Sequence, residues 1–228
     1  MQLFVVATPI GNLGDLSDRA REVFRAVSLV LAEDTRVTGK LMMHLGVKPT
    51  VYRFDENSTD GDIARLVTAM RGRASIALVT DAGTPNISDP AFKLIKASIE
   101  TFGDEIKIVP IPGPSALTAA LSIAHFPVQP FVFLGFPPHK KGREKFFEEV
   151  ANTESTVVFY ESVHRIKSCL ELLVSKVRDR EMLIARELTK LHEEVLRGSV
   201  QDVASKIVPE NSKGEFVIVL APKKYSVK

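Results

Sequence analysis

Small polar residues gather in a loop-like stretch, "TDAGTPNISDP" (residues 80–90), directly after the apolar run "SIALV". Such a strand followed by Gly, Pro, Asp, Thr and Ser indicates a ligand loop. Phosphate-binding loops of the form G-x-x-x-x-G-K-[ST] need a lysine that this stretch lacks, and "GNLG" (residues 11–14) does not match G-x-G-x-x-G. The sequence therefore favours a small ligand without phosphate, held by backbone amides, carbonyls and hydroxyls.

Other kinds of site find little support in the residues. The single cysteine, Cys169, excludes a disulfide framework, and the five histidines are scattered without metal-ligand spacing, so we expect no metal site. Ser115 follows "PGP" where a helix is expected to begin, but no partner histidine or G-x-S-x-G motif accompanies it. We interpret Ser115 as a helix N-terminal hydroxyl rather than a nucleophile.

The elements that must position these loops follow an α/β pattern, because short runs rich in Val, Ile and Phe alternate with helical periodicity. We expect a first helix capped by Ser17, a third from about Asp60 to Arg71, and a fourth with Ser88 as N-cap. Expected strands of the first half are Leu3–Ala7, Leu29–Ala32, Val51–Phe54, Ser75–Thr80 and Lys107–Ile111. Expected strands of the second half are Phe131–Leu134, Thr156–Tyr160, Met182–Arg186 and Phe216–Leu220, with a further strand in "HEEVLRG" and a short helix before residue 207.

The turn-rich segment "HFPVQP" (residues 125–130) is the best boundary between two lobes. We therefore predict an N-terminal α/β lobe over residues 1–126, with a mostly parallel sheet, and a C-terminal α/β lobe over residues 127–228. The ligand of an open α/β sheet lies outside the carboxyl ends of the strands. The unusual motifs of this chain gather at those ends.

Composition sets further bounds. Of 228 residues, 45% are hydrophobic and 25% are charged, as in ordinary globular proteins, and the net charge of +2 neither demands nor excludes nucleic-acid binding. No run of eighteen apolar residues occurs, and the N-terminal "MQLFVVATPIGN" lacks the basic region of a signal peptide. These features predict a soluble cytoplasmic protein.

Several long motifs occur in the order found in one family: "VATPIGNLGD", "EDTR", "TDAGTPNISDP", "IPGPSALTAALS", "FLGFPP", "FYESVHR", "ARELTK" and "GEFVIVL". The chain resembles, over nearly its whole length, the 2′-O-ribose cytidine methyltransferases of small-subunit ribosomal RNA, within the tetrapyrrole methylase superfamily. Wider relatives tend to have Gly-Asp-Pro where this chain has Gly83-Thr84-Pro85, and an uncharged Thr there is typical of the ribosomal RNA branch.

The resemblance implies a two-lobed tetrapyrrole-methylase-like fold, with a mixed sheet in the second lobe and S-adenosylmethionine bound in the cleft between the lobes. It also implies a homodimer that acts on the decoding region of 16S-like ribosomal RNA in the small subunit. By position, the donor contacts would be Pro9, Asp81, Ala82, Thr84, Ile87, Ser115, Ala116, Tyr160, Ala185 and Arg186.

A ribose hydroxyl is a weak acid, so a base that takes its proton would assist the transfer. The candidates are Glu33 and Asp34 after the second strand, and Glu187 and Lys190 in "ARELTK". Two alternatives stay open: "EDTR" forms only an ion pair, or Lys190 binds phosphate.

The segment "HKKGREK" (residues 139–145) is rich in cations, which can neutralise RNA phosphates. We expect Lys140, Lys141 and Arg143 to contact RNA, and Arg36, Arg165 and Lys190 to extend this basic rim. The alternative is a solvated helix start. Tyr160 either stacks on a base or packs in the core.

Two departures from the family pattern bear on the target. Members usually have an "HEHN"-like segment after the third strand, whereas this chain has "FDEN" (residues 54–57), and His125 stands where a small residue is common. Two other functions stay open: a small-molecule methyltransferase acting on a tetrapyrrole-like acid, and a non-catalytic RNA-binding protein of ribosome assembly. The intact cofactor loops argue against the second.

Overall fold

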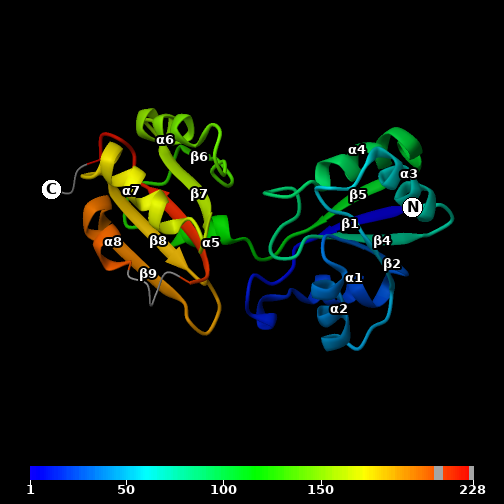
Figure 1. The fold of residues 1–228 in the computed structure, drawn as a ribbon. Coiled ribbons are helices and arrows are strands. Elements are labelled where there is room, and N and C mark those ends of the chain that lie inside the picture. Colours follow the sequence, from blue (N-terminus) through cyan, green and yellow to red (C-terminus); the bar gives the residue numbers. More distant parts are fainter. Residues whose placement is uncertain (208–212, 226–228) are drawn as a thin grey trace. The chain divides into compact units, whose positions relative to one another are not determined.

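A computed structural model describes residues 1–207 and 213–225 of the chain (Figure 1). The chain forms two compact units, Met1–Ser115 and Ala116–Lys228. The division therefore falls earlier than the boundary drawn at residue 126. Helix α5 (Ala116–Ser122) belongs to the second unit, because Leu117, Ala120 and Leu121 pack against the sheet of that unit.

The first unit contains a five-stranded sheet in the order β3-β2-β4-β1-β5, and every neighbouring pair is parallel. Its strands are β1 (Gln2–Val6), β2 (Leu29–Ala32), β3 (Thr50–Arg53), β4 (Ser75–Val79) and β5 (Lys107–Ile111). Its helices are α1 (Asp18–Ala26), α2 (Thr35–His44), α3 (Asp60–Met70) and α4 (Ala91–Phe102), with short 3₁₀ turns at Leu13–Asp15 and Gly103–Glu105.

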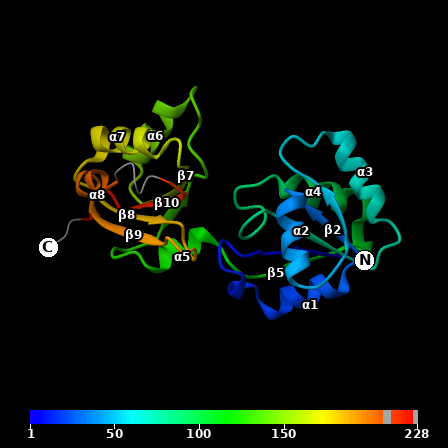
Figure 2. The ribbon, with the colours of Figure 1, turned by 60° about the horizontal axis from the view of Figure 1, so that its bottom comes forward.

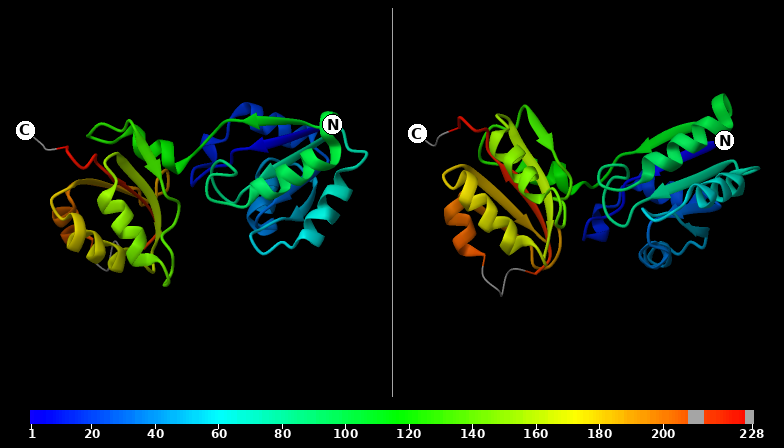
Figure 3. Two further views of the ribbon diagram at one scale, coloured as in Figure 1. Left: turned by 90° about the horizontal axis from the view of Figure 1, so that it is seen from above. Right: turned by 45° about the horizontal axis from the view of Figure 1, so that its top comes forward.

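Both faces of this sheet are covered by helices. All four residues of β2 are buried, and alternate residues serve opposite faces. Leu29 and Leu31 pack with α3 and α4, whereas Val30 and Ala32 pack with α1 and α2. Figures 1 and 3 show these helix pairs on the two sides of the sheet.

The second unit contains a mixed five-stranded sheet in the order β6-β7-β10-β8-β9, in which only β6 and β7 are parallel. Its strands are β6 (Phe131–Phe133), β7 (Thr156–Ser162), β8 (Glu181–Arg186), β9 (Glu194–Ser199) and β10 (Glu215–Leu220). The helices that follow α5 are α6 (Arg143–Asn152), α7 (Ile166–Val177) and α8 (Val200–Lys206). The predicted strand in "HEEVLRG" and the short helix after it are confirmed as β9 and α8.

Two apolar clusters lie on opposite faces of this second sheet. Helices α6, α7 and α8 pack on one face, over residues such as Phe159 and Ile218, and α5 packs on the other, over Val158 and Val219. Figure 2 shows α6, α7 and α8 on one side of these strands and α5 on the opposite side. The predicted fold class, a parallel α/β lobe with a second mixed-sheet lobe, is confirmed.

Helix starts follow local side-chain chemistry. Ser17 caps α1 as predicted, because its hydroxyl accepts a hydrogen bond from Ala20 N. Ser88 does not cap α4. The Asp89 carboxylate accepts hydrogen bonds from Ala91 N (2.9 Å) and Asn86 N (2.8 Å), so it holds both the helix start and the preceding loop. In the described part of the chain, no helix is long and apolar enough to cross a membrane.

Candidate functional site

Three loops of the first unit are joined at the carboxyl ends of the adjacent strands β4, β1 and β5. Thr8 and Gly83 exchange backbone hydrogen bonds of 2.9 and 3.1 Å, which tie the loop after β1 to the loop after β4. The Thr8 hydroxyl donates to Thr80 O, and the Thr84 hydroxyl donates to Pro114 O at 3.1 Å. The last of these bonds brings in the loop after β5. The three loops therefore form one backbone-rich wall.

Gly83 sits in this wall with a φ of +86°, a conformation that residues with a Cβ rarely adopt. A Cβ at this position would lie 3.4 Å from Ile10 Cγ2 and 3.7 Å from Pro114 O. Gly113 has a similar constraint, since its Cβ would lie only 3.0 Å from Ala7 Cβ. These glycines let the loops after β1, β4 and β5 approach closely.

The predicted donor residues of the first unit all belong to these loops. Ala82 and Ile87 are exposed, and Pro9, Asp81, Thr84 and Ser115 are half-buried. The hydroxyl of Thr84 supports the wall through Pro114. The structure thus brings these six residues onto one edge of a single sheet.

Carboxylates gather beside the wall, after β2 and β4. Glu33 Oε2 accepts a 2.6 Å hydrogen bond from the Thr80 hydroxyl, and Asp81 Oδ1 accepts a 2.8 Å bond from Asp34 N. Burial raises the pKa of Asp81, and the nearby charge of Glu33 adds to this. With Arg36 as the neighbouring cation, the group of Glu33, Asp34 and Asp81 is net negative. Such a surface favours a cationic ligand over a phosphate.

The carboxylate of Asp34 is already bound by Arg36. It binds the Arg36 guanidinium, with a shortest distance of 2.6 Å, and caps α2 through Arg36 N. Hydrogen bonds from Arg36 hold the pKa of Asp34 far below its usual range. We therefore remove Asp34 from the candidate bases. The ion pair left open for "EDTR" is present, but it uses Asp34 and leaves Glu33 bound to Thr80.

In the second unit, Tyr160 and Ala185 lie on the same sheet face, on either side of Val217 in β10. The Tyr160 ring packs edge-on against Phe133 and Phe136, and burial raises its pKa. Tyr160 is thus a half-buried residue of β7, packed against two aromatic rings. Ala116 begins α5 on this face. Arg186 binds Glu194 at 3.0 Å and Lys213 O at 3.0 Å.

The segment after β8 holds a compact ion network. Lys190 Nζ lies 2.8 Å from Glu187 Oε1 and 2.8 Å from Glu215 Oε2. Burial acts to lower the pKa of Lys190, but the two carboxylates outweigh it and the pKa is raised. Burial acts to raise the pKa of Glu187, but Lys190 outweighs it and the pKa is lowered. Both groups stay charged near neutral pH, so a protonated Lys190 is a poor base.

The backbone of the same segment is strained. Glu187 and Thr189 have positive φ angles of 50° and 67°, which are unusual for residues with a Cβ and most unusual for a β-branched one. Gly214 lies against Glu187, since a Cβ there would come within 2.5 Å of Glu187 Cγ. This strain is a feature that the sequence analysis did not anticipate, and strained backbone clusters at functional sites.

Arg143 and Arg165 have internal partners that the sequence analysis missed. Both guanidiniums bind the fully buried carboxylate of Glu161, at 3.1 and 2.9 Å, and their own side chains are only 12% and 15% exposed. Each also donates to the loop before α6, through Pro138 O and Pro137 O. These contacts position the loop before α6, and the RNA contact of Arg143 and Arg165 stays a prediction. Lys140 and Lys141, in the turn before α6, are exposed and remain available.

Replacement of Glu161 by Gln is expected to lower the free energy of unfolding by about 2–4 kcal/mol, because it leaves two largely buried arginines without their counter-ion. Urea denaturation followed by circular dichroism measures this loss. Gln in place of the exposed Glu171 of α7 is the matched control and should change stability by less than about 0.5 kcal/mol. Equal stability of the two variants would show that Glu161 does not organise this cluster.

Within residues 1–207 and 213–225, no group of three or more His, Cys, Asp or Glu side chains could hold a metal ion. His125, which departs from the family pattern, binds Glu181 at 3.0 Å and packs edge-on against Phe126. His125 is thus an exposed residue of the second unit whose ring contacts Glu181 and Phe126.

Comparison with known proteins shows the family of this chain. The family model of tetrapyrrole (corrin/porphyrin) methylases matches residues 2–204. The chain belongs to this family. It is also 42% identical over 222 residues to the ribosomal RNA small subunit methyltransferase I of Xylella fastidiosa, covering 96% of this chain and 80% of that protein. The protein of the same name from Thermotoga maritima is 38% identical, and 97% and 99% of the two chains are covered. These relatives place the chain in the ribosomal RNA branch of the methylase family.

Solved structures of the family share the fold at low identity. The methyltransferase CobJ matches with a TM-score of 0.69 and 18% identity, covering 100% of this chain and 97% of that one. Diphthine synthase matches with a TM-score of 0.71 and 14% identity, covering 97% and 90%. At this identity the likeness supports the fold alone.

Proposed function

We propose that this protein transfers the methyl group of S-adenosylmethionine to the 2′-oxygen of a cytidine ribose in small-subunit ribosomal RNA. The observation that carries the proposal is the identity of 42% and 38%, over nearly the whole chain, to two proteins named ribosomal RNA small subunit methyltransferase I. The tetrapyrrole methylase fold supports methyl transfer, and the cytidine ribose as target follows from the family resemblance of the motifs.

The wall formed by the loops after β1, β4 and β5 suits this donor. Backbone groups and hydroxyls of residues 8–9, 81–84 and 114–115 can hold its uncharged parts, and Gly83 lets the loops after β1, β4 and β5 approach one another closely. The net negative charge of Glu33, Asp34, Asp81 and Arg36 matches a sulfonium cation. When bound, the donor supplies an electrophilic methyl group. The family resemblance adds Ile87, and Ala116, Tyr160, Ala185 and Arg186 of the second unit, as further donor contacts.

Glu33 is the carboxylate that we assign as general base. Asp34, Glu187 and Lys190 are each held in ion pairs, whereas Glu33 is oriented by the neutral hydroxyl of Thr80 at 2.6 Å. A carboxylate fixed in this way can accept the ribose proton as the oxygen bonds to the methyl carbon. The transfer would break the bond between the methyl carbon and the sulfur. It would leave S-adenosylhomocysteine, the methylated ribose and a protonated Glu33, which returns its proton to water.

We further propose that the protein acts as a homodimer, as the family resemblance implies, and in the cytoplasm, as the composition predicts. The exposed Lys140 and Lys141 are the proposed phosphate contacts of the second unit, with the 87%-exposed Arg36 and the Lys190 network as further candidates.

Conversion of Lys140 and Lys141 to Gln is expected to weaken RNA binding and to lower the salt slope of log K against log[salt] by about 1.4, since each phosphate contact to a single strand contributes about 0.7. Titration of labelled RNA at several salt concentrations measures this, with donor affinity from calorimetry unchanged. Lys96→Gln/Lys107→Gln, at two exposed sites of the first unit, is the control. An unchanged slope in the Lys140/Lys141 variant would exclude this segment from the RNA contact.

The activity itself is tested by incubating the protein with donor labelled on its methyl group and small ribosomal subunits that lack their native modification. We expect label in the RNA. Label in a porphyrin precursor but none in RNA would identify a small-molecule methyltransferase instead. Donor binding without transfer to either substrate would favour a non-catalytic RNA-binding protein.

A further inference from the structure

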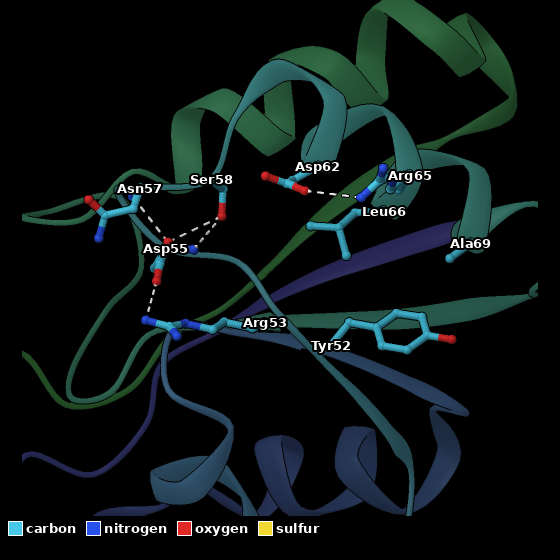
Figure 4. Close-up of a pocket in the computed structure, with 9 residues that line it drawn as sticks. All are labelled: Tyr52, Arg53, Asp55, Asn57, Ser58, Asp62, Arg65, Leu66 and Ala69. Carbon is cyan, nitrogen blue, oxygen red and sulfur yellow. Dashed lines mark hydrogen bonds and ion pairs between the residues drawn. The ribbon is translucent and has the colours of Figure 1, made fainter.

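A groove of about 740 Å³ runs between the edge strand β3 and helix α3 of the first unit (Figure 4). Tyr52 and Arg53 line it from the strand, Asn57 from the "FDEN" segment, and Arg65 and Leu66 from the helix. None of these residues belongs to the wall of loops proposed to bind the donor. The volume is within the range of sites that hold small molecules or parts of larger ligands.

The apolar part of the groove centres on Tyr52. This residue pairs with Leu31 of β2 and therefore points to the face covered by α3, where Leu66 and Ala69 form the facing wall. Because β3 is the edge of the sheet, no further strand covers Tyr52, and the residue is 41% exposed. An exposed aromatic ring beside an aliphatic wall is a platform on which a nucleobase can stack.

The polar part carries two arginines with spare donors. Arg53 binds Asp55, and Arg65 lies 3.6 Å from Asp62, yet their side chains are 69% and 86% exposed. A guanidinium has five N–H donors, so one carboxylate partner leaves others for phosphate oxygens. The two acidic partners keep the groove close to neutral overall. Stacking, more than net charge, would therefore hold a ligand here.

The groove leads toward the proposed base. Arg53 pairs with Ala32 in the sheet, and Phe54 N donates to Ala32 O at 2.7 Å, so the strand end beside the groove lies next to the residue that precedes Glu33. An RNA strand with a ribose at Glu33 would thus have the groove within reach of a neighbouring nucleotide.

We propose that this groove binds a single-stranded RNA nucleotide that flanks the methylated residue, with its base stacked on Tyr52 and a phosphate on Arg65. The inference rests on the proposed RNA methylation and adds a subsite to it. It also gives the "FDEN" segment a role, since Asp55 holds Arg53 and Asn57 presents its amide at the end of the groove.

The test measures the binding of a short fluorescein-labelled single-stranded RNA by polarisation at several salt concentrations. Tyr52→Ala should weaken binding about tenfold or more without changing the salt slope, and Tyr52→Phe should retain affinity. Arg65→Gln should weaken binding and lower the slope by about 0.7. The controls are Phe92→Ala, which removes another exposed aromatic ring, and Arg25→Gln, which removes another exposed cation.

Tyr52→Ala binding equal to that of the wild type, with wild-type protein still methylating small subunits, would overturn the groove and leave the proposed function standing. Wild-type protein that transfers no methyl group to RNA would instead overturn the proposed function. All the substituted side chains are exposed, so we expect each variant to fold. Thermal unfolding checks this.

Discussion

Replacement of Glu33 by Gln is expected to lower the rate of methyl transfer about 10²–10⁴-fold, the usual contribution of a positioned general base. The amide keeps the size of the side chain and can still accept a hydrogen bond from Thr80, so the fold and the loops should persist. Single-turnover transfer from labelled donor to unmodified small subunits gives the rate. Donor affinity, measured by calorimetry, should fall far less than the rate.

The pH dependence separates a base from a merely structural carboxylate. If Glu33 takes the ribose proton, the remaining activity of Glu33→Gln should rise with pH, because hydroxide then replaces the missing base. Glu22→Gln, at an exposed site of α1, is the control and should match the wild type. A wild-type rate in Glu33→Gln, with loss of activity in Asp81→Asn, would transfer the role to Asp81.

Substitution of Gly83 by Val is expected to weaken donor binding about 10- to 100-fold, which corresponds to backbone strain of about 1–3 kcal/mol. Gly83 has a φ of +86°, and an added side chain would crowd Ile10 and Pro114 O. The loop after β4 must then move away from Thr8, with which Gly83 shares two hydrogen bonds. Calorimetric titration with S-adenosylmethionine measures the loss.

Gly46→Val provides the matched control for this prediction. Gly46 has a φ of +68°, but an added Cβ would meet no atom within 4 Å. It follows α2, away from the three joined loops, so the strain costs stability without reaching the donor. Equal donor affinity in Gly83→Val and Gly46→Val would exclude the wall of loops from the donor site.

The sequence predicted the elements well wherever burial dominates. Leu29–Ala32 is apolar throughout because both faces of β2 are covered, so its strand assignment needed no tertiary information. The division between the units was harder to place. The apolar residues of α5, such as Leu117 and Leu121, predict a helix with a buried face, but periodicity does not tell which sheet that face covers. The capping side chain at the start of α4 was also predicted one residue too early, since the carboxylate of Asp89, and not the hydroxyl of Ser88, accepts the hydrogen bond from Ala91 N.

The candidate site was likewise predictable from the sequence only in part. The loop motifs correctly located the wall of loops, because parallel strands bring their carboxyl ends to one edge. Charge in "HKKGREK" could not distinguish the exposed Lys140 from Arg143, which is only partly exposed and paired with Glu161. One signal was present, since Glu161 alternates in phase with the core residues Val157 and Phe159 of β7. A carboxylate on a core face needs cationic partners, which predicts the burial of nearby arginines.

The position of the transferred methyl group tests the proposed function most directly. Small ribosomal subunits lacking the modification would be incubated with the protein and labelled donor, and their RNA digested to nucleosides for mass spectrometry. We predict label in 2′-O-methylcytidine, at one position of the small-subunit RNA, with loss of that product in Glu33→Gln. Label in a nucleobase, or in the ribose of another nucleoside, would contradict the assignment.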